Sequence, residues 1–190
     1  MKRKYELKAR ALRQAETRER IVEAAVDLHT SVGPARTTVS AIAQRAGVER
    51  HTVYAHFADE RKLFEACTSH WEAAHPFPDP TGWPAVDDPR SRLRAALRDL
   101  YGWYETVEQH MAIFRRDAQV HDLNAEVVAG YDLQLAGLAD ELARVWPRRK
   151  SVRAAVGHAL EFDTWRSLVR RQGLSRTQAV DAMLRLVESV

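Results

Sequence analysis

The chain of 190 residues has a single cysteine, Cys67, and no long run of apolar residues. One cysteine excludes a disulfide bond within the chain, and nothing in the cysteine content indicates an oxidising compartment. A membrane-spanning helix needs about 18 or more consecutive apolar residues, and no run approaches that length. The charged N-terminus also lacks the apolar core of a signal peptide. We therefore expect a cytoplasmic protein that is not inserted in a membrane.

The sequence also lacks the residue patterns on which enzymes and metal sites depend. Cys67 and His70 are three residues apart, but no second pair has the spacing of a zinc site. No glycine-rich phosphate loop is present. His158 and Glu161 would share a helical face, whereas Asp163 would not, so these three residues do not form a catalytic set. We predict no metal, no cofactor and no enzymatic activity.

Positive charge is concentrated near the N-terminus, although the net charge is only +3. Residues 1–75 hold 13 Lys and Arg against 10 Asp and Glu, whereas residues 76–190 hold 16 of each. The first 20 residues alone carry eight basic and three acidic side chains. A local excess of this kind is the electrostatic footprint expected of a surface that binds nucleic acid.

Residues 38–57 have the pattern of two short helices joined by a tight turn. Thr38 is suited to cap the first helix, and Gly47 is suited to end it, because glycine readily adopts a left-handed backbone. The apolar side chains of the first helix share one face, namely Val39, Ile42, Ala43 and Ala46. The second helix begins near Glu49 and buries Val53 and Phe57. The segment therefore predicts a helix-turn-helix, whose second helix enters the major groove of DNA.

The other face of this second helix is polar. It carries side chains that can bond phosphates and base edges, namely Arg50, His51, Thr52, Tyr54 and His56. Arg50 can bond guanine or a phosphate, and Thr52 can meet a phosphate or a thymine methyl group. The alternative for any one of them is a solvated surface position, and this alternative holds equally for Arg45 on the first helix.

Several segments together resemble the DNA-binding domain of the TetR family of transcriptional regulators. They are residues 17–28, Gly33, 37–43, 46–48, 52–54 and 56–57. The resemblance covers about residues 17–66 and implies a homodimer, with a three-helix DNA-binding head and a larger all-helical domain that binds an inducer. It supports DNA contacts along the second helix and also at Thr38 and Ser40. Family members usually hold a phosphate with a lysine where this chain has Glu60, and the neighbouring Arg61 and Lys62 could take over.

The residues around this motif predict further helices of the head. Residues 1–16 are basic and rich in helix formers, so they could extend the next helix, form a mobile arm along DNA, or remain a solvated tail. A helix over residues 17–32 covers the helix-turn-helix and ends at Gly33. Asp59 caps a fourth helix, which we expect to be the only continuous link to the rest of the chain and to carry the allosteric signal.

Residues 75–89 contain five of the seven prolines and predict a boundary loop. We therefore divide the chain into two domains of an all-α fold. Residues 1–75 form the helix-turn-helix domain with its basic extension and connecting helix, and residues 76–190 form a helical regulatory and dimerisation domain. Within the second domain we expect helices from Pro89 to Val107, over 112–120, from Asn124 to Pro147, over 151–171 and over 175–190.

The last two predicted helices carry more apolar residues than one buried stripe requires. This surplus indicates a homodimer formed through these helices as a four-helix bundle between protomers. The alternative is that neighbours within the same chain cover both stripes.

Aromatic residues in the second domain are candidates for a ligand pocket, namely Trp103, Phe114, Tyr131, Phe162 and Trp165. They are equally suited to form a hydrophobic core. Together with the resemblance, they suggest a small apolar or aromatic effector whose identity the sequence does not give.

We therefore expect a transcriptional regulator, specifically a ligand-responsive repressor that binds a palindromic operator in double-stranded DNA as a homodimer. The alternative is a helical small-molecule-binding or interaction protein whose head no longer reads DNA. Glu60 is the residue that motivates this alternative.

Overall fold

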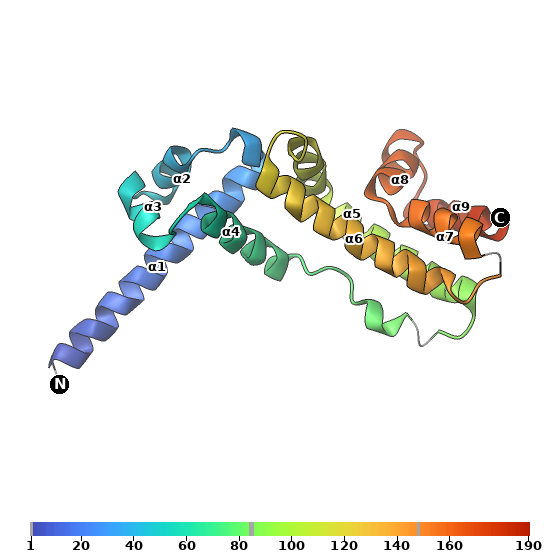
Figure 1. The fold of residues 1–190 in the computed structure, drawn as a ribbon, viewed down its shortest axis with the longest axis horizontal. Helices are drawn as coiled ribbons and strands as arrows, with labels where there is room; N and C mark the ends of the chain where they lie inside the picture. The colour runs from blue at the N-terminus through green and yellow to red at the C-terminus, as the bar shows by residue number, and fades with distance from the viewer. Residues whose placement is uncertain (1, 84–85, 148) are drawn as a thin grey trace. The chain divides into compact units, whose positions relative to one another are not determined.

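The computed structural model describes residues 2–83, 86–147 and 149–190, and within these ranges the regular elements are all helices (Figure 1). Residues 84 and 85 of the predicted boundary loop lie outside the described residues. The predicted all-α class is confirmed. In chain order the elements are α1 (Lys2–Ser31), η1 (Pro34–Arg36), α2 (Val39–Ala46), α3 (Arg50–His56), α4 (Glu60–Ala74), η2 (Pro80–Gly82), α5 (Pro89–Asp117), α6 (Asp122–Ala143), α7 (Arg149–Leu160), α8 (Phe162–Arg166), the π-helix η3 (Ser167–Arg171) and α9 (Arg176–Glu188). No helix in the described ranges is long and apolar enough to cross a membrane.

The chain forms two compact units that are not contiguous in sequence. The first contains the chain up to Pro76 together with Ala112–Ala125, and the second contains Phe77–Met111 together with Glu126–Val190. Both α5 and α6 therefore contribute residues to both units. The expectation that α4 is the only continuous link is wrong, because α5 and α6 cross between the units as well. The assignment of DNA binding to residues 1–75 and of regulation to residues 76–190 stays a prediction.

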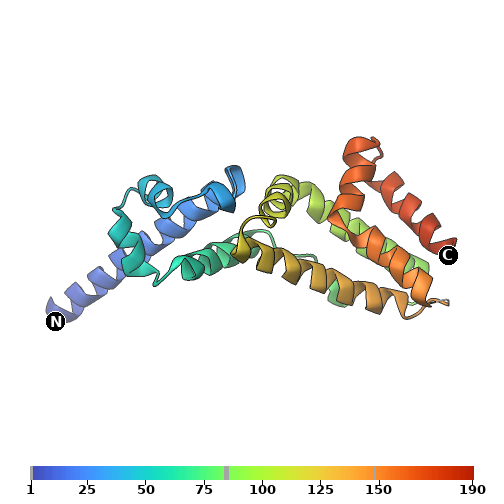
Figure 2. The same ribbon diagram turned by 45° about the horizontal axis from the view of Figure 1, so that its top comes forward.

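The core of the first unit lies where α1 contacts α2, α3 and α4 (Figure 2). Apolar side chains at helical spacing on each of these helices meet in one cluster, because each helix buries a single stripe. The members of the cluster are Ile21, Val22, Ala24, Ala25, Val39, Ile42, Ala43, Ala46, Val53, Phe57, Leu63 and Cys67. Val48, in the turn between α2 and α3, is half-buried against it. The predicted helix-turn-helix therefore has a complete core behind it.

The local signals at the helix ends are confirmed. The Thr38 side chain accepts a hydrogen bond from the Ala41 amide at 3.1 Å, and Asp59 accepts one from the Lys62 amide at 2.8 Å. Gly47 has a left-handed backbone with φ of 66°. The helix predicted over residues 17–32 differs at both ends, because α1 already begins at Lys2 and ends at Ser31, leaving Val32 exposed.

Two predicted helix boundaries in the second half of the chain are wrong. α5 runs without a break to Asp117, because no glycine or proline interrupts residues 103–117. Asn124 does not cap α6 but lies inside it, fully buried, and its amide group donates to the Phe114 carbonyl at 2.6 Å. His121 takes the capping role instead, since its Nδ1 accepts from the Asn124 backbone amide at 3.2 Å.

The single helix predicted over residues 151–171 is interrupted after Leu160. Its continuation consists of α8 and the π-helix η3. Two buried tyrosines of α5 account for the interruption, because the Tyr101 hydroxyl donates to the Ala159 carbonyl at 2.8 Å and the Tyr104 hydroxyl donates to the Leu160 carbonyl at 2.7 Å. These carbonyls are thereby satisfied from outside the helix at the point where the chain turns.

The apolar surplus on the last predicted helices is mostly covered within one chain. Their buried residues include Val152, Val156, Ala159 and Leu160 on α7, and Val180, Met183, Leu184 and Val187 on α9. Leu186 remains 37% exposed. The alternative in which neighbours of the same chain cover both stripes therefore accounts for most of this surface. The predicted capping box of α9 is confirmed by the reciprocal bonds between Ser175 and Gln178.

Candidate nucleic-acid interface

The outer face of α3 carries the five polar residues predicted to contact DNA. Arg50, His51 and Tyr54 are exposed, and Thr52 and His56 are half-buried, whereas Val53 on the opposite face is fully buried. On a helix, residues four apart lie close together, so Arg50 and Tyr54 share one side of α3, while Thr52 and His56 share another. All five predicted contacts keep access to solvent, and Arg50, His51 and Tyr54 are the most accessible of them.

Arg50 and Tyr54 form a pair on this surface. The Arg50 guanidinium donates to the Tyr54 hydroxyl at 3.3 Å and lies 5.6 Å from the centre of its ring. The hydrogen bond to Tyr54 raises the pKa of Arg50, so the cation is retained. The guanidinium keeps further N–H donors for a base edge or a phosphate. One tyrosine thus orients the cation of the neighbouring helical turn.

The first turn of α2 supplies two hydroxyl groups. The Thr38 oxygen already accepts the Ala41 amide, but its hydroxyl hydrogen can still be donated to a phosphate. Ser40 is exposed on the same turn. The positive end of the helix dipole and the free amides of this turn favour an anion here.

The start of α4 attracts a phosphate less strongly than it would with a lysine at position 60, where this chain has Glu60. Glu60 is exposed in the first turn, and the Lys62 ammonium is paired with Glu65 at 2.7 Å. The hydrogen bond to Glu65 raises the pKa of Lys62. Both partners are largely exposed, and such pairs contribute at most about 1 kcal/mol, so a phosphate can displace Glu65. Lys62 stays a predicted DNA contact, and it would bind a phosphate by releasing Glu65.

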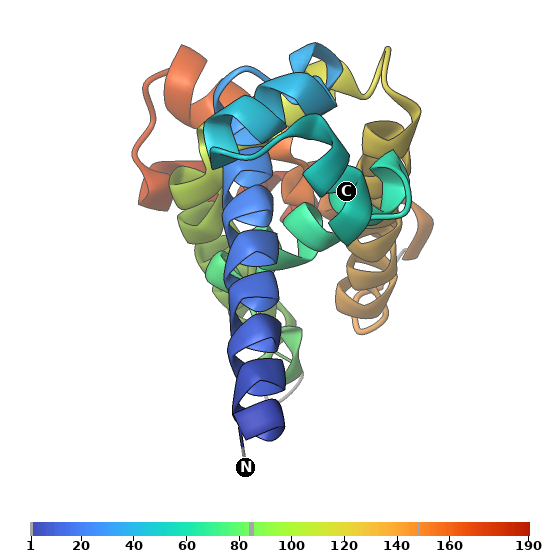
Figure 3. The ribbon, with the colours of Figure 1, turned by 90° about the vertical axis from the view of Figure 1, so that its left-hand side faces the viewer.

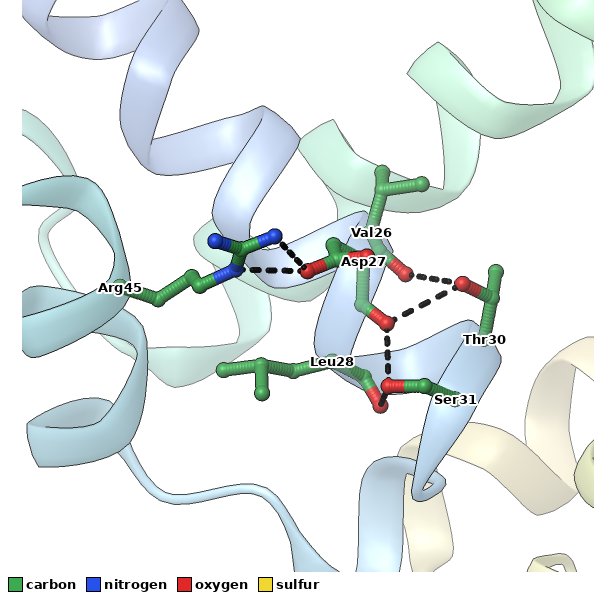
Figure 4. A network of polar contacts seen from close by, with 6 residues as sticks. All are labelled: Val26, Asp27, Leu28, Thr30, Ser31 and Arg45. Atoms are coloured by element: carbon green, nitrogen blue, oxygen red, sulfur yellow. Dashed lines mark hydrogen bonds and ion pairs between the residues drawn. The ribbon is translucent and has the colours of Figure 1, made fainter.

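Arg45 is held on the head itself. Its guanidinium Nε donates to Asp27 on α1 at 2.7 Å, and its Nη2 lies 2.6 Å from the same carboxylate oxygen (Figure 4). The Thr30 and Ser31 hydroxyls donate to backbone carbonyls one turn earlier in α1, beside this pair. Arg45 therefore links α2 to α1, in agreement with the alternative that it is a surface residue.

The corner that precedes α2 is fixed by the end of α5. The buried Asp117 carboxylate accepts the Ala35 amide at 3.0 Å, and Arg116 donates to the Val32 carbonyl at 3.0 Å. Burial alone would raise the pKa of Asp117, but its bonds to Arg116 and to the Ala35 amide outweigh this and lower it. The sequence does not predict these contacts between the end of α5 and the corner before α2, because the contacting residues are more than 80 positions apart and neither segment carries a motif.

A pocket of about 470 Å³ opens beside these elements. Its walls include three predicted DNA contacts, Thr38, Ser40 and Arg50, together with Glu60. Its apolar lining comes from η1, α2, α4 and the start of α6, and His29 and His121 also line it. Because Glu60 shares this hollow with Arg50, its negative charge offsets the positive charge that Arg50 would present to a phosphate.

His29, which lines the pocket, is buried against Cys67. The Cys67 thiol donates to the Phe64 carbonyl at 3.1 Å and lies 3.2 Å from His29 Nδ1. Burial, reinforced by the nearby His121, lowers the pKa of His29 to about 4, and burial raises the pKa of Cys67 to about 12. Both side chains are therefore neutral near pH 7. The described ranges contain no group of three or more acidic, histidine or cysteine residues that could hold a metal ion.

Four of the five residues predicted for an effector pocket lie in one aromatic cluster of the second unit. Tyr104 lies 5.4–5.6 Å from the rings of Trp103, Phe162 and Trp165, and Tyr131 lies 6.3 Å from Trp103. The fifth residue, Phe114, belongs to the first unit, where it stacks on Phe64 at 6.3 Å. All are buried except the half-buried Tyr131. The Trp165 indole nitrogen is buried without a hydrogen-bond partner.

Comparisons with known proteins support this architecture. Residues 21–67 match the model of the bacterial regulatory proteins of the tetR family. A search among curated proteins found no match. Among solved structures, a TetR-like transcriptional regulator from Rhodococcus sp. RHA1 superposes with a TM-score of 0.63 at 21% identity, over 90% of this chain and 93% of that chain.

Two further solved structures have named roles. NalD, the secondary repressor of the MexAB-OprM multidrug efflux pump in Pseudomonas aeruginosa, has a TM-score of 0.58 at 18% identity, over 93% of this chain and 96% of its own. The fatty acid degradation regulator FadR from Bacillus halodurans has a TM-score of 0.56 at 17% identity, over 90% and 94%. At these identities the likeness shows the fold.

The head and the fold together define an all-α protein with a helix-turn-helix domain and a second helical unit. Residues 21–67 match the model of the tetR family of bacterial regulatory proteins, and the chain as a whole has the fold of a solved TetR-like transcriptional regulator.

Proposed function

We propose that the chain is a ligand-responsive repressor that binds a palindromic operator as a homodimer. The observation that carries this proposal is the outer face of α3, where Arg50, His51 and Tyr54 are exposed in front of a complete helix-turn-helix core. In such a motif the second helix reads base edges in the major groove, and two heads read half-sites spaced by the dimer. The homodimer is proposed from the family, with α7–α9 as its interface.

The first prediction concerns Tyr54. Purified protein mixed with fragmented DNA from its own genome at near-physiological salt is expected to enrich one palindrome. Tyr54→Ala removes a ring that orients Arg50 and a hydroxyl that can bond phosphate, so we expect operator affinity to fall by about tenfold to a hundredfold. Sequencing of the recovered DNA and titration of the selected site measure both effects.

Leu133→Ala is the matched control, because Leu133 is 75% exposed on the part of α6 that belongs to the second unit. Tyr54→Phe separates the hydroxyl from the ring. If wild type and Tyr54→Ala enrich the same palindrome equally, α3 does not read DNA as proposed.

The rival function is a small-molecule-binding or interaction protein whose head no longer reads DNA. Glu60 in the first turn of α4 and the Lys62–Glu65 pair favour it, because both reduce attraction for a phosphate. The selection of DNA by the wild-type protein decides between the two functions. If a DNA complex forms, its affinity should also fall steeply as the salt concentration rises. Absence of any enriched sequence would favour the rival, and Glu60→Lys would then test whether that one charge is responsible.

We infer that the effector is a small, largely apolar molecule that carries a hydrogen-bond acceptor. The aromatic cluster around Tyr104 supplies apolar surface, and the Trp165 indole N–H is a buried donor without a partner. An unsatisfied buried donor costs roughly 1–3 kcal/mol, which an accepting ligand would recover. Similarity to a regulator of fatty acid degradation and to a repressor of a multidrug efflux pump supports this chemical class.

The second prediction uses Trp165→Phe, which removes the unpartnered donor and keeps an aromatic ring. We expect the ligand-free protein to be as stable as wild type or slightly more stable, while the affinity for a fatty acid ligand falls about tenfold. Thermal unfolding with and without a panel of fatty acids measures both quantities.

Trp83→Phe is the contrasting variant, because the Trp83 indole already donates to Asp99 at 3.1 Å. It should lose about 1 kcal/mol of stability and keep its ligand affinity. If Trp165→Phe left the affinity for every bound ligand unchanged, Trp165 would not be the effector donor.

A further inference from the structure

The N-terminal part of α1 stands apart from the packed head. α1 is one helix of 30 residues, and its second half packs on α2 and α4 through fully buried residues such as Ile21 and Ala25. Residues 6–16, in contrast, are exposed except for the half-buried Ala9. Figure 3 shows this extension continuing past the short helices of the head. Nothing in the described part of the chain covers it.

The extension has an excess of positive charge. Residues 2–16 hold six Lys and Arg against two Glu. The Lys8, Arg10 and Arg13 side chains are exposed, and none of them forms an ion pair within the described ranges. Arg45, on the packed part of the head, is by comparison neutralised by Asp27. Three exposed cations without an ion pair among the described residues therefore lie within residues 8–13, on the part of α1 that precedes the packed head.

A helical segment of this kind gains little from its own chain. Isolated helices of about 12–15 residues are marginal in water, and like charges along the helix repel one another. A polyanion would remove that repulsion and would favour the helix. The charge of the extension is therefore complementary to a row of phosphates.

The extension leaves the head beside the end of α3. The Arg18 guanidinium lies 4.8 Å from the centre of the Phe57 ring, which directly follows α3. Five turns of an α-helix take about 18 residues, so Leu7 and Arg10 lie on the same face of α1 as Ala25 and Leu28, which pack on the head. The extension thus continues from the proposed DNA-reading surface.

We propose that residues 2–16 are a second DNA-binding element, which contacts backbone phosphates that flank the half-site read by α3. Fifteen helical residues span about 22 Å, which matches about six phosphates of one strand. The element binds phosphates regardless of the base sequence, because its Lys and Arg side chains contact only the DNA backbone. The proposal rests on the DNA-binding function proposed above.

The experiment compares two triple variants of the full chain with the same loss of charge. The test variant carries Lys8→Gln, Arg10→Gln and Arg13→Gln, which keep good helix formers. The control variant carries Arg90→Gln, Arg98→Gln and Arg144→Gln, three exposed residues of the second unit that lie outside the proposed dimer helices α7–α9. Binding constants for the genomically selected operator are measured with long flanks and with trimmed flanks, at several salt concentrations.

We expect the slope of log K against log salt to become shallower by up to about 3 per protomer in the test variant, at about 0.9 for each lost phosphate contact. Affinity on the long operator should fall at least tenfold at low salt, with an unchanged preference for operator over random DNA. The control variant should match wild type. On the trimmed operator, wild type and test variant should bind alike.

The outcomes separate this proposal from the proposed function. If wild type selects no operator, the DNA-binding function itself fails. If wild type binds an operator and the test variant keeps the same salt slope, only the extension proposal fails, and its charge then serves another acidic partner. An equal loss in the control variant would also overturn it, because the effect would then come from net charge alone.

Discussion

Gly33→Ala is expected to lower the free energy of unfolding by about 3 kcal/mol. Gly33 has φ of 101°, a backbone conformation that side chains rarely adopt and that costs roughly 1–3 kcal/mol for other residues. A Cβ at this position would also lie 2.2 Å from an Asp117 carboxylate oxygen and 2.6 Å from an Arg116 nitrogen. Crowding of this kind adds roughly 1–3 kcal/mol. Urea unfolding followed by circular dichroism measures the change.

Gly130→Ala is the matched control for this substitution. Gly130 lies in α6, and a Cβ there would meet nothing within 4 Å. Alanine is the better helix former, so this variant should gain up to about 1 kcal/mol. A loss of stability in Gly33→Ala together with a gain in Gly130→Ala would establish that the corner before α2 requires a glycine. A Gly33→Ala variant as stable as wild type would contradict the tight joint with α5.

Acidification from pH 6.5 to pH 4 is expected to remove about 3 kcal/mol of stability through His29 alone. Burial, together with the nearby His121, lowers its pKa from 6.5 to about 4. Between these two values the unfolded chain takes up a proton that the folded chain does not, so the stability falls as pH falls. The contribution of His29 to stability is fully present above pH 6.5. Between pH 6.5 and pH 4, each pH unit lowers the free energy of unfolding by about 1.4 kcal/mol.

The measurement is urea unfolding at pH 7, 5.5 and 4.5 for wild type and His29→Gln. The variant should be less stable than wild type at pH 7, because the packing of His29 beside Cys67 is lost. That difference should narrow as the pH is lowered, since the variant has no buried imidazole to keep neutral. A difference between wild type and His29→Gln that stays constant with pH would show that folding does not lower the pKa of His29.

The features predicted from the sequence are those set by interactions between residues that are close in sequence. Thr38, Asp59 and the Ser175–Gln178 capping box act within one helical turn, and Gly47 acts within one residue, so each is visible in the local sequence. The polar face of α3 follows from helical periodicity in the same way. The sequence therefore sufficed for the helix-turn-helix and for the position of its outer residues, while their contacts with DNA stay predictions.

The features that the sequence did not reveal depend on partners far along the chain. The break after Leu160 is stabilised by the hydroxyl of Tyr104, 56 residues earlier, and the corner at Ala35 is held by Asp117, 82 residues later. Asn124 has the residue type of a cap, but burial against Phe114 places it inside α6 instead. No local pattern distinguishes these residues from surface positions, because their roles come from packing between elements.

The non-contiguous first unit limits how this protein can be dissected or recombined. A fragment that ends at Pro76 would keep every residue of the family match, yet it would lack Phe114 against Phe64 and the Asp117 carboxylate against the Ala35 amide. A chimera that joins this head to another effector domain therefore needs more than one junction. Residues 112–125 must be transplanted with the head, as an internal segment within the foreign sequence.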